Sequence, residues 1–265
     1  MHRDDFAHTL GVVAVALGWT VYLSDDSFAA DPGKAFEART FDSGVESLNY
    51  RLLKPWDYDA AQNYPLVLFL HGAGERGSDN RKQLVHGMKD FATDEAMTKR
   101  PCFVVAPQCP AGQKWVNVDW SAAGHTMPAK PSDSLRLTMA LVEHLEKKFS
   151  IDAGRIYITG LSMGGYGVWD AVQRYPERFA TAVPVCGGGD PKQAKQLAEL
   201  PIWAFHGARD GVVKPHRSQE MIEAIKKVGG EPKYTEYPRA GHDSWSATYR
   251  DPRMHEWLFD QRRGE

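Results

Sequence analysis

The sequence has few cysteines and no long run of charge of one sign. Its 265 residues include three cysteines, so a disulfide framework is excluded and at most one bridge could form. The 32 basic and 34 acidic residues give a formal net charge of -2, without the basic face that nucleic-acid-binding proteins usually carry. We therefore expect no nucleic-acid partner.

Motifs for metals and nucleotides are also lacking. The chain has no HExxH, no cluster of cysteine and histidine and no Walker loop, so no catalytic metal is expected. Gly72, Gly74 and Gly77 do match the G-x-G-x-x-G pattern of dinucleotide-binding proteins. However, a polar loop follows the last glycine, and the next expected strand ends in Pro107-Gln108 where that motif needs an acidic residue. We expect no cofactor.

One long apolar stretch is present, Leu10–Leu23. It is too short for a membrane span, which needs about 20 residues, but it suits the core of a signal peptide. A signal peptide is expected to begin with a positively charged segment, and Asp4 and Asp5 reduce that charge here. An uncleaved hydrophobic anchor or a wrongly assigned first residue therefore stays open. We predict a signal peptide over 1–29, a secreted or periplasmic protein, and no stable membrane span in the mature chain.

Beyond residue 40, short apolar runs alternate with amphipathic stretches. Stretches around Leu135–Phe149, with Ser134 as the expected cap, and Met221–Val228 have helical spacing. This alternation predicts an α/β fold with a mostly parallel sheet, helices on both faces and one domain over 30–265. The expected strands are Tyr64–Leu70, Cys102–Ala106, Arg155–Thr159, Thr181–Val185, Ile202–Phe205 and Tyr234–Tyr237.

A G-x-S-x-G motif, Gly160 to Gly164, follows one of these strands and precedes an expected helix. This context indicates a tight turn that exposes the hydroxyl of Ser162 as a nucleophile. A serine nucleophile needs a base and an acid that orients the base. Asp210 and His242 follow the last two expected strands, Ile202–Phe205 and Tyr234–Tyr237. They are preferred to Asp243, because the side chains of the adjacent residues Asp243 and His242 would not face each other.

The loop after the first expected strand is rich in glycine and fits an oxyanion hole. We expect one amide donor from Met163, directly after the serine, and a second from Ala73. Gly74 is the alternative second donor and a candidate substrate contact. His71 and His206 end strands just before glycines and are interpreted as scaffold residues.

Together, the segments YPLVLFLHGAGERGSDN, PQCP, GLSMGGYG, HGARDGVV and AGHDSW resemble the serine α/β-hydrolases. Within them the chain is similar to the phospholipase/carboxylesterase and dienelactone-hydrolase-like group, which extends to predicted peptidases and feruloyl-esterase-like enzymes of carbohydrate esterase family 1. The resemblance implies Ser162, Asp210 and His242 as the triad. Dienelactone hydrolases use a cysteine nucleophile, so their lactone chemistry is not implied here.

The stretch from Gly187 to Glu199 is short, so no large lid domain is expected. Trp115 and Trp120 lie in the long loop from Pro110 to Ser132, where they form either an aromatic platform for substrate or packing over the sheet edge. Trp245 is interpreted as a brace for His242.

These observations predict a serine hydrolase that cleaves small-molecule or polymer-attached carboxylic esters through an acyl-enzyme, including carbohydrate- or phenolic-linked esters. A serine peptidase of the same fold stays open, because the same groups cleave amides. A non-catalytic binding module of this fold is the remaining alternative, but it would not need an intact triad.

Overall fold

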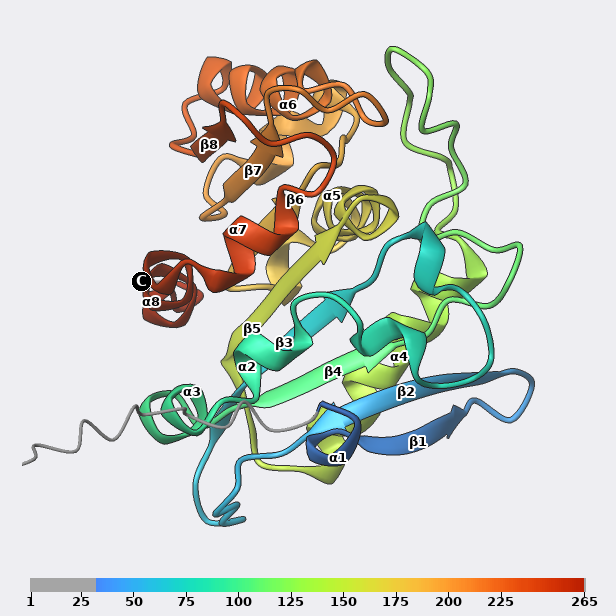
Figure 1. Ribbon diagram of the computed structural model, residues 1–265, viewed down its shortest axis with the longest axis vertical. Coiled ribbons are helices and arrows are strands. Elements are labelled where there is room, and N and C mark those ends of the chain that lie inside the picture. Colours follow the sequence, from blue (N-terminus) through green and yellow to red (C-terminus); the bar gives the residue numbers. More distant parts are fainter. Residues whose placement is uncertain (1–31, 265) are drawn as a thin grey trace, which may run out of the picture.

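The computed structural model describes residues 32–264. An eight-stranded sheet runs through its centre in the order β1-β2-β4-β3-β5-β6-β7-β8 (Figure 1). The pairs β1/β2 and β2/β4 are antiparallel, and the other neighbouring pairs are parallel. The strands are β1 Glu37–Asp42, β2 Ser47–Leu53, β3 Tyr64–Leu70, β4 Phe103–Pro107, β5 Ile151–Leu161, β6 Thr181–Val185, β7 Trp203–Gly207 and β8 Lys233–Tyr237.

The central strands are buried on both faces, as their continuous apolar sequences predict. In β3 every residue is buried. Leu66, Leu68 and Leu70 belong to one hydrophobic core, whereas Val67 and Phe69 belong to the other, because successive side chains of a strand point to opposite faces.

Helices cover both faces of the sheet (Figure 1). The first core is closed by α4 Asp133–Lys148, α5 Met163–Arg174 and α6 His216–Lys227. The second core is closed by α2 Met88–Phe91, α3 Asp94–Lys99, α7 Trp245–Arg250 and α8 Pro252–Asp260. The remaining elements are short, namely α1 Pro32–Ala35 and the 3-10 helices η1 Ala73–Glu75, η2 Lys82–Leu84, η3 Pro176–Arg178 and η4 Pro191–Leu197.

Two details differ from the sequence expectations. The antiparallel strands β1 and β2 were not predicted, because β1 lies at the sheet edge and alternates between half-buried and exposed residues. The cap of α4 is Ser132 and not Ser134: the Ser132 hydroxyl accepts from the amide of Leu135, while Ser134 is already in the first turn and donates to Gln113.

The predicted signal peptide, residues 1–29, lies outside the described residues. Among the helices of residues 32–264, none combines the length and the apolar composition needed to cross a membrane.

Candidate active site

Ser162 lies at the sharp turn between β5 and α5. Its φ of 54° and ψ of -117° place a non-glycine residue in a strained region of backbone space. The turn is tight because Gly164 packs directly on β3: a Cβ added there would lie 1.9 Å from the carbonyl oxygen of Leu70. The backbone geometry is therefore that of the predicted nucleophile turn.

Ser162, His242 and Asp210 form a continuous chain of hydrogen bonds. The Ser162 Oγ lies 2.9 Å from Nε2 of His242, and Nδ1 of His242 lies 2.7 Å from Oδ2 of Asp210. When Nδ1–H donates to the carboxylate, Nε2 is left to accept the serine proton. The three sequence-predicted residues thus meet, although 80 positions separate Ser162 from His242.

Asp210 is fixed by its own loop. Its Oδ1 accepts hydrogen bonds from the amides of Val212 and Val213, at 2.8 and 3.0 Å. Burial alone would raise the pKa of Asp210, but hydrogen bonds from His206, His242 and the Val212 amide outweigh it and lower the pKa. The carboxylate is therefore charged at neutral pH and can stabilise a protonated His242.

His206 contacts this series of hydrogen bonds, whereas the rival acid Asp243 bonds elsewhere. His206, expected as a scaffold residue, is fully buried and places Nε2 3.3 Å from Oδ2 of Asp210. Asp243, the rival acid, is exposed and accepts a hydrogen bond from the Ser246 amide at the start of α7. No sequence signal marks the His206 contact, because it depends on how the β7 loop folds back.

The expected oxyanion donors face the same pocket as Ser162. Met163 is the first residue of α5, so its amide has no partner within the helix. Ala73 and Gly74 belong to η1, and all three residues line the pocket. Arg76 braces this loop, since its Nε donates to the carbonyl oxygen of Ala73 at 2.9 Å.

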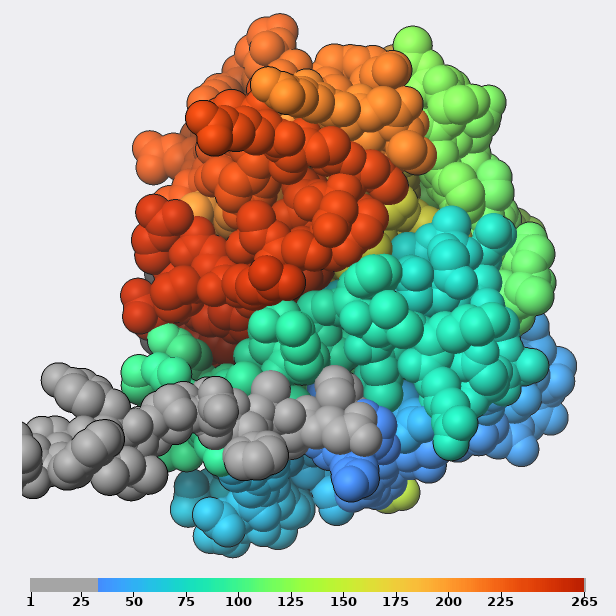
Figure 2. All heavy atoms as spheres, viewed as in Figure 1, coloured from blue at the N-terminus to red at the C-terminus, as the bar shows by residue number. Residues whose placement is uncertain are grey.

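The pocket has a volume of about 310 Å³ and lies where segments far apart in sequence meet. Figure 2 shows the yellow surface of the chain near β5 and α5 between the teal segment after β3, the green loop and the red C-terminal segment. Further lining residues are Gly72, Glu75, His86, Trp120, Leu161, Val212, Val213 and Trp245.

Two of the tryptophans considered above lie at the pocket, and the third lies in the hydrophobic core. Trp120 lines the pocket, and Trp245 packs edge-on against His242 with ring centroids 5.2 Å apart, consistent with a brace. Trp115 is fully buried, and its Nε1 donates to the carbonyl oxygen of His71 at 2.9 Å. The expectation that Trp115 belongs to a substrate platform is therefore wrong, because its ring is core packing.

One group of side chains has the residue types of a metal site. The ligand atoms of Cys186, Asp210 and His242 all lie within 4.8 Å of one another. A cysteine binds metal as the thiolate, yet burial raises the pKa of Cys186, and the Asp210 and His242 atoms already bond each other. The donor set fits a hydrogen-bonded triad better than a metal site.

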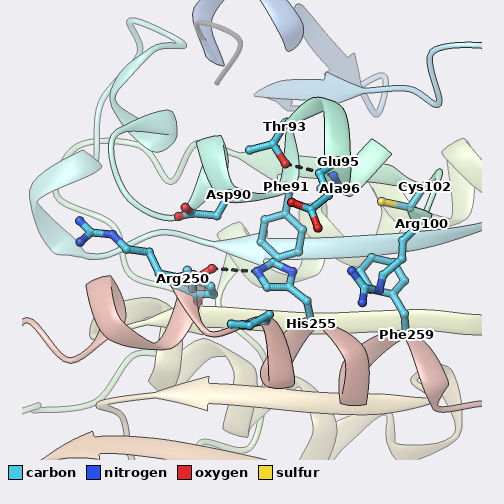
Figure 3. A pocket seen from close by; sticks show the side chains of 12 residues that line it. Asp90, Phe91, Thr93, Glu95, Ala96, Arg100, Cys102, Arg250, His255 and Phe259 are labelled. Carbon is cyan, nitrogen blue, oxygen red and sulfur yellow. Dashed lines mark hydrogen bonds between the residues drawn. The ribbon is translucent and has the colours of Figure 1, made fainter. Parts of the chain in front are cut away.

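A second pocket, of about 210 Å³, lies between α2 and α3 on one side and α7 and α8 on the other (Figure 3). It contains Asp90, Thr93 and His255 but none of the predicted site residues. His255 donates from Nε2 to the carbonyl oxygen of Tyr249, and Thr93 caps α3. The side chains of Thr93 and His255 therefore serve the local structure.

The model of the family described as phospholipase/carboxylesterase matches residues 59–255. The chain belongs to this family. Its membership confirms the family resemblance and the predicted class, a carboxylesterase-type hydrolase of the α/β-hydrolase fold.

Individual relatives agree with this family. The solved structure of a thermostable esterase is similar with a TM-score of 0.80 and 39% identity, over 87% of this chain and 64% of that one. A protein of Aspergillus niger, described as a probable feruloyl esterase C, is 26% identical over 94% of this chain and 85% of its own length. A secreted, uncharacterized protein of Arthroderma benhamiae is 26% identical over 69% of this chain, which spans only 22% of that relative's length.

Proposed function

We propose that the protein is a serine carboxylesterase in which Ser162, His242 and Asp210 act as the catalytic triad. The observation that carries the proposal is the unbroken hydrogen-bonded chain of these residues at a pocket that also holds Met163 and Ala73. A hydroxyl becomes a competent nucleophile when a positioned base removes its proton.

In the first half of the reaction, Oγ of Ser162 attacks the ester carbonyl carbon while Nε2 of His242 takes the hydroxyl proton. Negative charge develops on the carbonyl oxygen, and the amides of Met163 and Ala73 donate hydrogen bonds to it. Asp210 holds His242 in the required tautomer. The tetrahedral intermediate then expels the alcohol, which receives the proton from Nε2, and leaves the acyl group on Ser162.

In the second half, water replaces the alcohol. His242 accepts a proton from the water as its oxygen attacks the acyl carbon, and the same amides stabilise the second oxyanion. Collapse returns the proton to Oγ of Ser162 and releases the carboxylic acid. Each proton removed is thus delivered within the cycle.

The substrate we propose is a small-molecule or polymer-attached ester, including carbohydrate- or phenolic-linked esters. The rings of Trp120 and Trp245 in the pocket wall support this class, because flat aromatic surfaces pack on sugar and phenolic rings. The short connection between β6 and β7, which holds only η4, supports access for a bulky ester. The similarity to a feruloyl esterase points the same way.

We also infer that residues 30–265 form one catalytic domain and that the protein is secreted or periplasmic. The single sheet of residues 32–264 supports the first point. The apolar segment Leu10–Leu23 and the similarity to a secreted protein support the second.

The test is hydrolysis of p-nitrophenyl acetate in parallel with a chromogenic peptide, by the parent and Ser162→Ala. We expect ester hydrolysis that Ser162→Ala abolishes and slower cleavage of the peptide. Ester hydrolysis at near the parent rate by Ser162→Ala would overturn the proposal. Faster turnover of the peptide than of the ester would favour the peptidase.

A further inference from the structure

Glu75 is a nearly buried carboxylate in the wall of the Ser162 pocket. Its side chain is 13% exposed, and the residue lines the pocket directly after Ala73 and Gly74. Within residues 32–264 its carboxylate accepts no hydrogen bond, and Nε2 of His86 lies 3.7 Å from Oε1. A carboxylate has room for about four hydrogen bonds, so Glu75 has free acceptor capacity in the wall of the pocket.

This carboxylate lies beside the groups proposed to do the chemistry. A Cβ added to Gly72 would lie 2.9 Å from Oε2 of Glu75, so the carboxylate packs against the loop that carries Ala73. Its neighbour His86 packs on Trp245 with ring centroids 5.4 Å apart, and Trp245 packs on His242. Glu75 and Ser162 therefore line the same pocket.

The charges nearby favour a neutral partner for Glu75 over a cation. Trp120 in the same pocket already has two cations over its ring, Nζ of Lys114 at 4.5 Å and Cζ of Arg76 at 5.9 Å from the centroid. A positively charged substrate group would be repelled by both. A hydroxyl avoids this repulsion and still donates to the carboxylate, in a hydrogen bond strengthened by the acceptor's charge.

We propose that Glu75 is a specificity-determining residue that accepts a hydrogen bond from a hydroxyl group of the substrate close to the ester carbonyl. The inference rests on the proposed esterase function. The hydroxyl belongs either to the acyl part or to the alcohol part of the ester, and the test separates these two sources.

The experiment measures kcat/KM for three matched pairs of esters. Methyl lactate against methyl propionate tests a hydroxyl in the acyl part. Trans-2-hydroxycyclohexyl acetate against cyclohexyl acetate tests a hydroxyl in the alcohol part. The 2-(trimethylammonio)ethyl and 3,3-dimethylbutyl acetates form the third pair, which tests a cation against a neutral group of the same shape. Each result is read as a ratio within a pair, which is independent of the fraction of folded enzyme.

The variants are Glu75→Ala, Glu75→Gln and, as a matched control, Glu223→Gln on the exposed side of α6. In one of the two hydroxyl pairs, we expect the parent's kcat/KM for the hydroxyl ester to exceed that for its partner by about tenfold or more, since hydrogen bonds to charged groups contribute strongly. Glu75→Ala should bring this ratio to about one, and Glu75→Gln should lower it by about fivefold because a neutral acceptor is weaker. Glu223→Gln should leave the ratio at its parent value.

Two results would overturn the inference. One is equal hydroxyl ratios in the parent and both Glu75 variants, and the other is a ratio that depends on Glu75 in the cationic pair instead. In either case the esters are still hydrolysed, so the proposed function stands. Failure of the parent to hydrolyse any of the six esters or p-nitrophenyl acetate would instead count against the esterase function itself.

Discussion

The pocket at Ser162 and the pocket between α3 and α8 contain similar residue types but arrange them differently. Both hold a hydroxyl residue, a histidine and at least one acidic residue (Figure 3). At Ser162 the hydroxyl, imidazole and carboxylate bond one another in series. In the second pocket, Thr93 and His255 bond the backbone. The comparison indicates that a catalytic site is marked by hydrogen bonds between its polar side chains, and not by the presence of such side chains in a pocket.

Replacing the two hydroxyl residues should give the largest contrast. Ser162→Ala should lower kcat/KM by a factor on the order of 10⁶, because triad residues act as a unit, with little change in the free energy of unfolding. Thr93→Ala should leave kcat/KM at the parent level but cost about 1 kcal/mol of stability through the lost helix cap. Steady-state kinetics and urea unfolding measure both effects. A large loss of activity in Thr93→Ala would erase the distinction between the pockets.

Replacing acidic residues tests the same contrast at a smaller scale. Asp210→Asn should lower kcat by about 10⁴-fold, because the neutral amide no longer stabilises the required tautomer and charge of His242. Asp90→Asn in the second pocket and Asp243→Asn beside His242 are the controls, and both should stay within about twofold of the parent, as expected for residues outside the triad. If Asp243→Asn gave the larger loss, the assignment of the acid would be wrong.

Low pH should lower the stability of both regions, because each contains a buried histidine. Burial lowers the pKa of His71 to about 4 and also lowers that of His255, so the folded protein keeps both rings neutral while the unfolded chain takes up protons below about pH 6.5. For His71 the resulting stability is complete above pH 6.5 and is lost as the pH falls to 4, a change of about 3 kcal/mol. Urea unfolding at several pH values measures it.

His71→Gln provides the control for this acid effect. The variant should be less stable at pH 7 and show a shallower fall in stability between pH 6.5 and 4 than the parent. An identical pH dependence in the two proteins would contradict the role given to the buried ring.

The two tryptophans of the long loop give the smallest expected effects. Trp120→Ala removes pocket wall and should raise KM so that kcat/KM falls about tenfold, the usual scale for one aromatic contact. Trp115→Phe removes the hydrogen bond to the His71 carbonyl oxygen and should cost about 1 kcal/mol of stability without changing KM. The reverse pattern would restore Trp115 as a substrate contact.

The sequence predicts most of the sheet because the central strands are apolar throughout, as β3 illustrates. It misses β1, whose polar residues at the sheet edge resemble a loop. It misassigns the cap of α4, since Ser132 and Ser134 are both plausible caps two residues apart, and only the backbone geometry selects Ser132. Such local choices depend on tertiary contacts that propensity does not contain.

The meeting of Ser162, Asp210 and His242 was predictable because each of them follows a strand, and the carboxyl ends of parallel strands meet at one edge. The burial of Trp115 was not predictable. Trp115 and Trp120 lie in the same irregular loop, and the sequence does not indicate which of the two faces the core. The contacts of His206 with Asp210 and of Glu75 with the pocket wall also depend on loops folding back. No spacing in the sequence encodes these contacts.

The most direct test of the account is the reaction of the parent protein with a fluorophosphonate probe, followed by identification of the modified peptide. Only a serine activated by a neighbouring base reacts readily with such a probe. We predict a single modification on Ser162, with labelling abolished in Ser162→Ala and strongly reduced in Asp210→Asn. Absence of labelling, or modification of a different serine, would contradict the account.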